Sequence, residues 1–188
     1  MTAMPTPSTP LLPHGRPLTY DDLAAIPDDG HRYELVDGVL IVTPSPVPRH
    51  QLVVGELHLL LRAAAPAGVR VFFAPLDVKL TDDTVLQPDL LVVRQEDVGP
   101  RNVQVAPLLA VEVLSPSTRL VDLNLKRARY EQAGCPAYWV VDPQTLEVVA
   151  WELRDGTYAE VARVGPGEVA ELQVPFAVTL RPEQLGPD

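Results

Sequence analysis

The chain contains 188 residues, of which 46% are hydrophobic and 21% are charged. This composition is typical of a globular protein that buries a core, and it excludes disorder as the general state. The 25 Asp and Glu residues outnumber the 15 Lys and Arg residues, so the net charge is −10. That charge excludes a broad basic face of the kind that binds duplex DNA. Any role on nucleic acid must therefore rest on a local site or on metal ions.

The cysteine count and the hydropathy pattern indicate the compartment. Cys135 is the only cysteine, which excludes an intramolecular disulfide framework and fits a reducing environment. The start of the sequence lacks a basic segment followed by an apolar run, so it predicts no secretory signal. No stretch approaches the ~18 apolar residues of a membrane span. We expect a soluble, cytoplasmic protein with no membrane partner.

The chain divides by composition into three parts. Residues 1–16 are rich in Pro, Thr and Ser and poor in large apolar groups, which predicts a flexible tail. Residues 17–143 carry the candidate core. Residues 144–188 alternate like antiparallel strands and are expected to pack on the same domain as an extension.

The first elements of the core are a short helix and a hairpin. Thr19, followed by acidic residues, is a candidate helix cap, and the helix should end by Pro27. Asp37-Gly38 between two apolar runs is the strongest short signal for a β-hairpin. A two-residue loop there places Glu34 beside Ile41, on a surface that it shares with apolar side chains. A carboxylate in that position needs a partner.

The rest of the core alternates between helices and apolar strands. Residues 50–64 have helical periodicity, with His50 on the core side. Further elements are predicted as strands at 69–80, 85–93 and 108–114, a helix at 122–133 and a strand at 138–141. Two of these strands are almost continuous apolar runs, as expected for strands buried on both faces. The order predicts a mixed α/β fold around a central sheet.

Two acids interrupt these apolar strands. Asp89 and Glu112 lie on consecutive core strands, where an isolated ionised carboxylate costs several kcal/mol, roughly, unless it is paired or bound to a metal. Two converging carboxylates require a shared proton or a cation between them. Their oxygen atoms suit Mg²⁺, Mn²⁺ or Ca²⁺ better than zinc. The alternative is that each acid lies at a strand end and is solvated or capped.

Lys126 adds a cation to this pair. The chain has only two lysines, Lys79 and Lys126, and the helical wheel places Lys126 with Leu123, Tyr130 and Ala133 on the stripe that faces the sheet. An inward amine beside two carboxylates can orient a water or stabilise charge that develops on a phosphate. The alternative is a lysine whose stem covers apolar surface while its amine reaches water.

A series of short motifs resembles one family. The motifs are Tyr33-Glu34-Leu35-Val36-Asp37-Gly38, Pro48-Arg49-His50-Gln51, Ala74-Pro75-Leu76-Asp77-Val78, Gln87-Pro88-Asp89-Leu90-Leu91, Val111-Glu112-Val113-Leu114-Ser115-Pro116-Ser117-Thr118, and Lys126 followed by Tyr138-Trp139-Val140-Val141-Asp142-Pro143. In this order and spacing they resemble the Uma-two family of endonucleases, within the PD-(D/E)xK restriction-endonuclease-like superfamily. The resemblance covers about residues 17–180.

The resemblance implies a restriction-endonuclease-like αβββαβ core with a mixed central sheet, an N-terminal β-hairpin and a C-terminal antiparallel extension. It maps the acidic pair of the superfamily onto Asp89 and Glu112. The usual lysine of the motif is replaced, because Val113-Leu114 stands in its place, and the resemblance moves that lysine to Lys126. It also implies that Glu34 joins the site as a further acid.

Together these observations predict a Mg²⁺-dependent endonuclease, with Mn²⁺ as a substitute ion. Asp89, Glu112 and the Val113 carbonyl are the candidate metal ligands, with Glu34 as a further one, and Lys126 assists. His50, Asp77 and Gln87 are candidate accessory residues. The predicted partner is nucleic acid, DNA above RNA, bound with weak non-specific affinity because of the net charge. A homodimer is compatible with this function, since two sites can cut two strands.

Three other functions remain open on sequence alone. The fold can serve as a non-catalytic, dimeric interaction module that retains its acids. A metal-free carboxylate pair, as in a glycoside hydrolase, is a second reading, although the low aromatic content of 5% disfavours a sugar platform. A structural homodimer that pairs through Trp151 and Tyr158 on the C-terminal hairpins is the third. Metal dependence separates the endonuclease from all three.

Overall fold

The computed structural model describes residues 12, 13, 15–115 and 119–186. The predicted tail at 1–16 and the motif residues 116–118 therefore fall mostly or wholly outside the described residues. The α-helices are α1 (Tyr20–Ala24), α2 (Pro48–Ala64) and α3 (Arg127–Gln132). Helix α3 directly follows a π-helical segment, η2 (Val121–Lys126). Two short 3₁₀ helices are η1 (Gln95–Asp97) and η3 (Pro182–Leu185). None of the helices in the described part of the chain is long and apolar enough to span a membrane.

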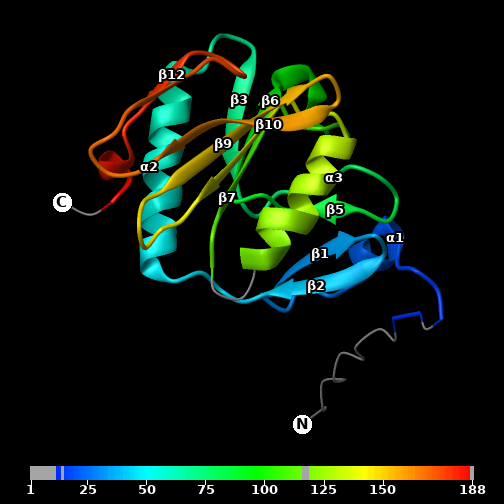
Figure 1. Ribbon diagram of the computed structural model, residues 1–188. Helices are drawn as coiled ribbons and strands as arrows, with labels where there is room; N and C mark the ends of the chain where they lie inside the picture. The colour runs from blue at the N-terminus through cyan, green and yellow to red at the C-terminus, as the bar shows by residue number, and fades with distance from the viewer. Residues whose placement is uncertain (1–11, 14, 116–118, 187–188) are drawn as a thin grey trace.

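A six-stranded mixed sheet forms the centre of the molecule (Figure 1). Its order is β10 (Thr157–Val164), β9 (Val148–Arg154), β8 (Ala137–Val141), β7 (Leu109–Val113), β6 (Leu90–Arg94) and β3 (Val69–Phe73). Only the β7–β8 pair is parallel; the other neighbours are antiparallel. With α2 before β3 and α3 between β7 and β8, the chain follows the predicted αβββαβ order, and the predicted mixed α/β fold is confirmed.

Two smaller sheets complete the fold. The first has the order β2 (Val39–Thr43), β1 (Arg32–Val36), β5 (Val85–Leu86) and β4 (Val78–Lys79), and the second pairs β11 (Ala170–Leu172) with β12 (Val178–Leu180). Thus β9 and β10 extend the central sheet, whereas β11 and β12 form their own ribbon.

The hairpin register agrees with the prediction. Asp37 and Gly38 both adopt positive φ angles, of 53° and 74°, as a type I′ turn requires. Val36 therefore pairs with Val39, and Glu34 pairs with Ile41. Glycine is needed at position 38 for a second reason, because a Cβ atom there would lie 2.3 Å from the Pro17 Cβ. The turn thus fixes which face of β1 carries Glu34.

Two strands predicted as single runs are each broken at a proline. The run 69–80 divides into β3 and β4, and the run 85–93 divides into β5 and β6, in different sheets. Pro75 and Pro88 lie at the two breaks, and a proline has no N–H to donate to a strand ladder. The second break has a structural use, because it turns the backbone N–H of Gln87 toward Glu34.

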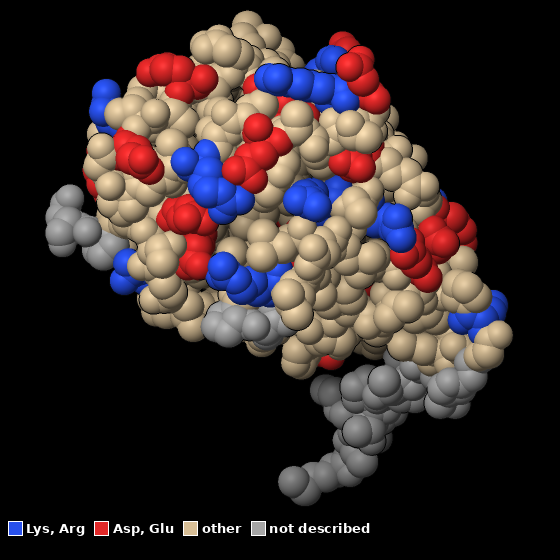
Figure 2. All heavy atoms as spheres, in the orientation of Figure 1, with Lys and Arg blue, Asp and Glu red and all other residues tan. Residues whose placement is uncertain are grey.

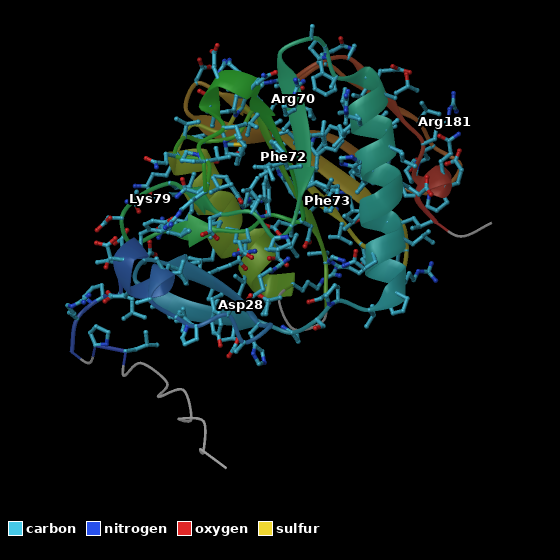
Figure 3. All side chains as sticks on the ribbon, turned by 180° about the vertical axis from the view of Figure 1, so that it is seen from behind. Asp28, Arg70, Phe72, Phe73, Lys79 and Arg181 are labelled. Carbon is cyan, nitrogen blue, oxygen red and sulfur yellow. The ribbon has the colours of Figure 1, made fainter. Side chains whose placement is uncertain are left out.

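Alternate residues of β7 and β8 face opposite sides of the central sheet. Val111 and Val113 pack in the core cluster that includes α2, whereas Ala110 and Tyr138 pack in the cluster that includes Tyr130 of α3. Figures 1 and 3 show α2 and α3 on opposite sides of the sheet. By this alternation Glu112 points to the side of η2 and α3.

The two aromatic residues considered for a dimer surface, Trp151 and Tyr158, make contacts within the chain. Trp151 is buried and its ring lies 6.0 Å from that of Tyr138. The Tyr158 hydroxyl donates a hydrogen bond to the Cys135 carbonyl at 2.9 Å, and its ring stacks on Tyr138. These two side chains therefore stabilise the α3 side of the sheet, and the strand that carries Tyr158, β10, is an edge strand of the central sheet.

Cys135 is expected to be unreactive in the folded protein. Its side chain is fully buried, and burial raises the pKa of the thiol to about 12. Because the thiolate is the reactive form, dithionitrobenzoate at about pH 8 should not label the native protein, whereas it should label one thiol per chain in denaturant. Absorbance of the released thionitrobenzoate measures both. Fast labelling of the native protein would contradict the burial of this thiol.

Candidate active site

A cleft of about 840 Å³ brings the predicted acids together. It opens between the β1–β2 hairpin, the start of α2 and the ends of β6 and β7, and its polar lining includes Arg32, His50, Gln87, Asp89, Glu112 and Asp122. Asp89 and Glu112 are almost fully buried at its base, with exposures of 4% and 1%. The sequence argument that consecutive core strands bring these two acids to one point therefore agrees with the geometry.

Asp89 is held as an ionised carboxylate by three donors. The backbone N–H of Val113 donates to Oδ2 at 2.8 Å, His50 Nε2 lies 3.2 Å from the same atom, and Arg32 donates to Oδ1 at 2.9 Å. Burial raises the pKa of Asp89, but the His50 contact and the Arg32 charge outweigh it and leave the pKa below its ordinary value. Asp89 is therefore charged at neutral pH.

Glu112 and Lys126 form a buried ion pair on the side of the sheet that faces η2 and α3. The Lys126 Nζ lies 3.2 Å from Glu112 Oε1, 2.9 Å from Glu34 Oε1 and 3.5 Å from Asp122 Oδ1. Burial lowers the pKa of Lys126, but these carboxylates raise it more, so the pKa lies above its usual value. Lys126 is an ammonium ion at neutral pH and has no role as a general base. Its side chain is 1% exposed and does not line the cleft.

The pKa of Glu112 depends on effects of opposite sign. Burial raises the pKa of Glu112, Lys126 lowers it, and Asp122, Asp89 and Glu34 raise it, so the pKa stands well above its ordinary value. Four carboxylates thus share this region with two permanent cations, Arg32 and Lys126. The excess of negative charge is the electrostatic setting in which a bound cation is favourable.

Glu34 contacts Lys126 from β1. It is fully buried, and its Oε1 accepts a hydrogen bond from the Gln87 N–H at 2.7 Å in addition to its contact with Lys126. The predicted position of Glu34 on an apolar surface is therefore correct, and Lys126 is its partner. Gln87 lines the cleft, and its side-chain amide donates to Asp77 Oδ1 at 2.7 Å. Asp77 itself does not line the cleft and reaches it only through Gln87.

Sequence reasoning missed two residues of the site. Arg32 shares the inward face of β1 with Glu34, two residues away, and this spacing was the available signal. Asp122 lies four residues before Lys126, so a helical wheel places both on one face. The predicted stripe included Ala133 instead, but α3 ends at Gln132 and Ala133 is an exposed C-cap.

With this geometry in view, the chain can be compared with known proteins. The family model Uma2, described as "Putative restriction endonuclease", matches residues 19–183. The chain belongs to the Uma2 family. This membership supports a nuclease function in general terms and nucleic acid as the class of substrate.

A solved structure extends the comparison to the fold. The crystal structure of "a putative nuclease belonging to DUF820" from Anabaena variabilis is similar with a TM-score of 0.71, at 20% sequence identity, over 90% of this chain and 97% of the other. At this identity the likeness establishes the shared fold. A search among curated proteins found no match.

The donor set of this Uma2 family site fits a magnesium-type ion. Mg²⁺ is typically held by one or two carboxylates and keeps several waters, so Asp89 and Glu112 at the base of a cleft suffice. Among the described residues, no three His, Cys, Asp or Glu side chains are grouped as a ready-made metal cage. A hard ion held by two carboxylates would keep an open coordination sphere, unlike the ion of a closed structural site.

Figure 2 bears on the substrate. On the face that it shows, blue Lys and Arg side chains alternate with red Asp and Glu side chains and form no broad basic patch. This pattern agrees with the net charge of −10.

Proposed function

We propose that this protein is a metal-dependent endonuclease that hydrolyses phosphodiester bonds, with DNA as the preferred substrate. The observation that supports this most strongly is the pair of buried acids, Asp89 and Glu112, at the base of an open cleft with the ammonium group of Lys126 beneath them. A structural pair of acids has no need of an open cleft, whereas a hydrolytic site does.

Asp89, Glu112 and the Val113 carbonyl would hold Mg²⁺, for which Mn²⁺ can substitute. When bound, such an ion lowers the pKa of a coordinated water and neutralises charge on the phosphate. The Val113 N–H and His50 already orient the Asp89 carboxylate in the folded protein. Binding of the ion therefore would not have to order this side chain.

Lys126 acts in this proposal as a positioning residue. Its ammonium group contacts Glu112 and Glu34 and opposes the rise in the pKa of Glu112 that burial causes. Glu34 in turn fixes Lys126, and Gln87 fixes Glu34. The sequence of contacts explains why the lysine of the motif can stand on the helix after β7 and still serve the acid on β7.

The decisive test is calorimetric titration of Mn²⁺ into the wild type and into Asp89→Ala and Glu112→Ala. We expect saturable binding in the wild type and its loss in both variants, because each removes one of two carboxylate ligands. Circular dichroism establishes that the variants remain folded. Absence of Mn²⁺ binding in the wild type would overturn the proposal and favour the non-catalytic interaction module.

A further inference from the structure

The cleft contains few cations that can meet a phosphate group. Lys126 is buried behind Glu112 and does not reach the cleft. Among the described residues that line it, the permanent cations are Arg32 and Arg119. Arg119 is half exposed at the rim, where it donates to Asp142 at 2.7 Å. Arg32 is the one beside Asp89 at the base.

Arg32 has hydrogen-bonding capacity that the described residues leave unused. One terminal nitrogen donates to Asp89 Oδ1 at 2.9 Å, and the other lies 4.0 Å from Glu34 Oε2, beyond hydrogen-bond range. The Nε atom is buried and has no hydrogen-bond partner among the described residues. The side chain is 21% exposed and lines the cleft.

A buried N–H without an acceptor costs about 1–3 kcal/mol. Arginine is ionised throughout the physiological pH range. An arginine that served only to neutralise Asp89 would need a single contact. The second terminal nitrogen of Arg32 makes no hydrogen bond to Glu34, and it belongs to a planar guanidinium on a residue that lines the cleft beside the acids; such a group matches the oxygens of a phosphodiester.

We propose that Arg32 is the residue of the cleft that binds the phosphodiester group of the substrate. This inference rests on the proposed function, since it places the bond to be cut next to Asp89 and Glu112. His50 lines the same cleft, but its Nε2 is engaged by Asp89, so it does not replace Arg32 as the cation for the phosphate. Arg32 is thus a substrate-binding residue, whereas Lys126 acts only through Glu112 and Glu34.

The test measures binding without metal and without cleavage. Fluorescence anisotropy of a labelled DNA oligonucleotide, as a single strand and as a duplex, is followed in EDTA for the wild type, Arg32→Gln, Arg32→Lys and Arg70→Gln. Arg70 is the charge-matched control, because it lies on β3 at the end of the molecule opposite Asp28, which lines the cleft (Figure 3). Circular dichroism and thermal melts accompany each variant.

We expect Arg32→Gln to weaken oligonucleotide binding by about 10-fold to 100-fold, the effect of losing hydrogen bonds to a charged group. Arg70→Gln should change it by less than about threefold. Arg32→Lys keeps the charge beside Asp89 but lacks the fork, so we expect an intermediate loss with near-normal stability. If Arg32→Gln fails to fold, Arg32→Lys decides the matter.

Two results would overturn this inference. One is equal oligonucleotide affinity for the folded Arg32 variants and for Arg70→Gln, which would leave Arg32 as a partner of Asp89 alone. The other is no binding of either oligonucleotide by the wild type. Neither depends on Mn²⁺ binding or on cleavage, so failure of the metal site and failure of the phosphodiester contact are seen in separate experiments.

Discussion

Replacing Lys126 by methionine is expected to lower the free energy of unfolding by about 3–5 kcal/mol. The substitution keeps most of the volume of the side chain but removes the ammonium group that contacts Glu34 and Glu112. Both carboxylates then remain fully buried without their main cation, and a buried uncompensated charge is among the largest single-residue penalties known. Urea unfolding followed by circular dichroism, in EDTA, measures the change.

The other lysine of the chain is a matched control. Lys79 pairs with Asp82 at 2.9 Å near the surface, where Asp82 is 73% exposed. An exposed pair of this kind contributes about 0–1 kcal/mol, so Lys79→Met should have a small effect. If the two substitutions cost the same, the ion pair beneath the cleft is not a main source of stability and the proposed role of Lys126 is wrong.

The cost of Lys126→Met should depend on pH. Glu112 has a pKa that is raised on folding, mainly by burial, and Lys126 is the group that opposes this. A carboxyl with a raised folded pKa is stabilising below its unfolded pKa and loses that contribution as the pH rises through the folded value. The deficit of the variant relative to the wild type should therefore shrink when urea unfolding is repeated at about pH 5 instead of about pH 8.

The parts of the site that lie close in sequence were predictable. The Asp37-Gly38 turn fixes the register of the hairpin and hence the inward face of Glu34. Helical periodicity places His50 and Lys126 on buried faces, and both are buried. These inferences succeed because each depends on the geometry of one element.

The contacts that join elements were not predictable in the same way. Arg32 and Asp89 meet across 57 positions of sequence, because β1 and β6 lie in different sheets that meet at the cleft. The local signal for Arg32, its spacing of two residues from Glu34, places it on the inward face of β1 but does not identify Asp89 as its partner.

Asparagine in place of Asp89 is expected to reduce cleavage of nucleic acid by at least about a hundredfold. The effect should exceed the 10-fold to 100-fold typical of residues that only support a ligand, because Asp89 is itself a proposed ligand. Its shape is nearly retained, but the negative charge is lost and only one of the two oxygens that accept from Arg32 (Oδ1) and from the Val113 N–H (Oδ2) remains. Single-turnover cleavage of labelled DNA and RNA in Mg²⁺ measures the rate.

Asp97→Asn is the appropriate control, because Asp97 follows β6 while Asp89 precedes it. Asp97 pairs with Arg94 at 3.6 Å, outside the cleft lining, so its loss should leave cleavage within about twofold of the wild type. This pair of variants also separates the activity of the chain from a trace contaminant. A contaminating nuclease would cleave equally in all three preparations, since a substitution in this chain leaves it unchanged, and equal rates would remove the case for catalysis at Asp89.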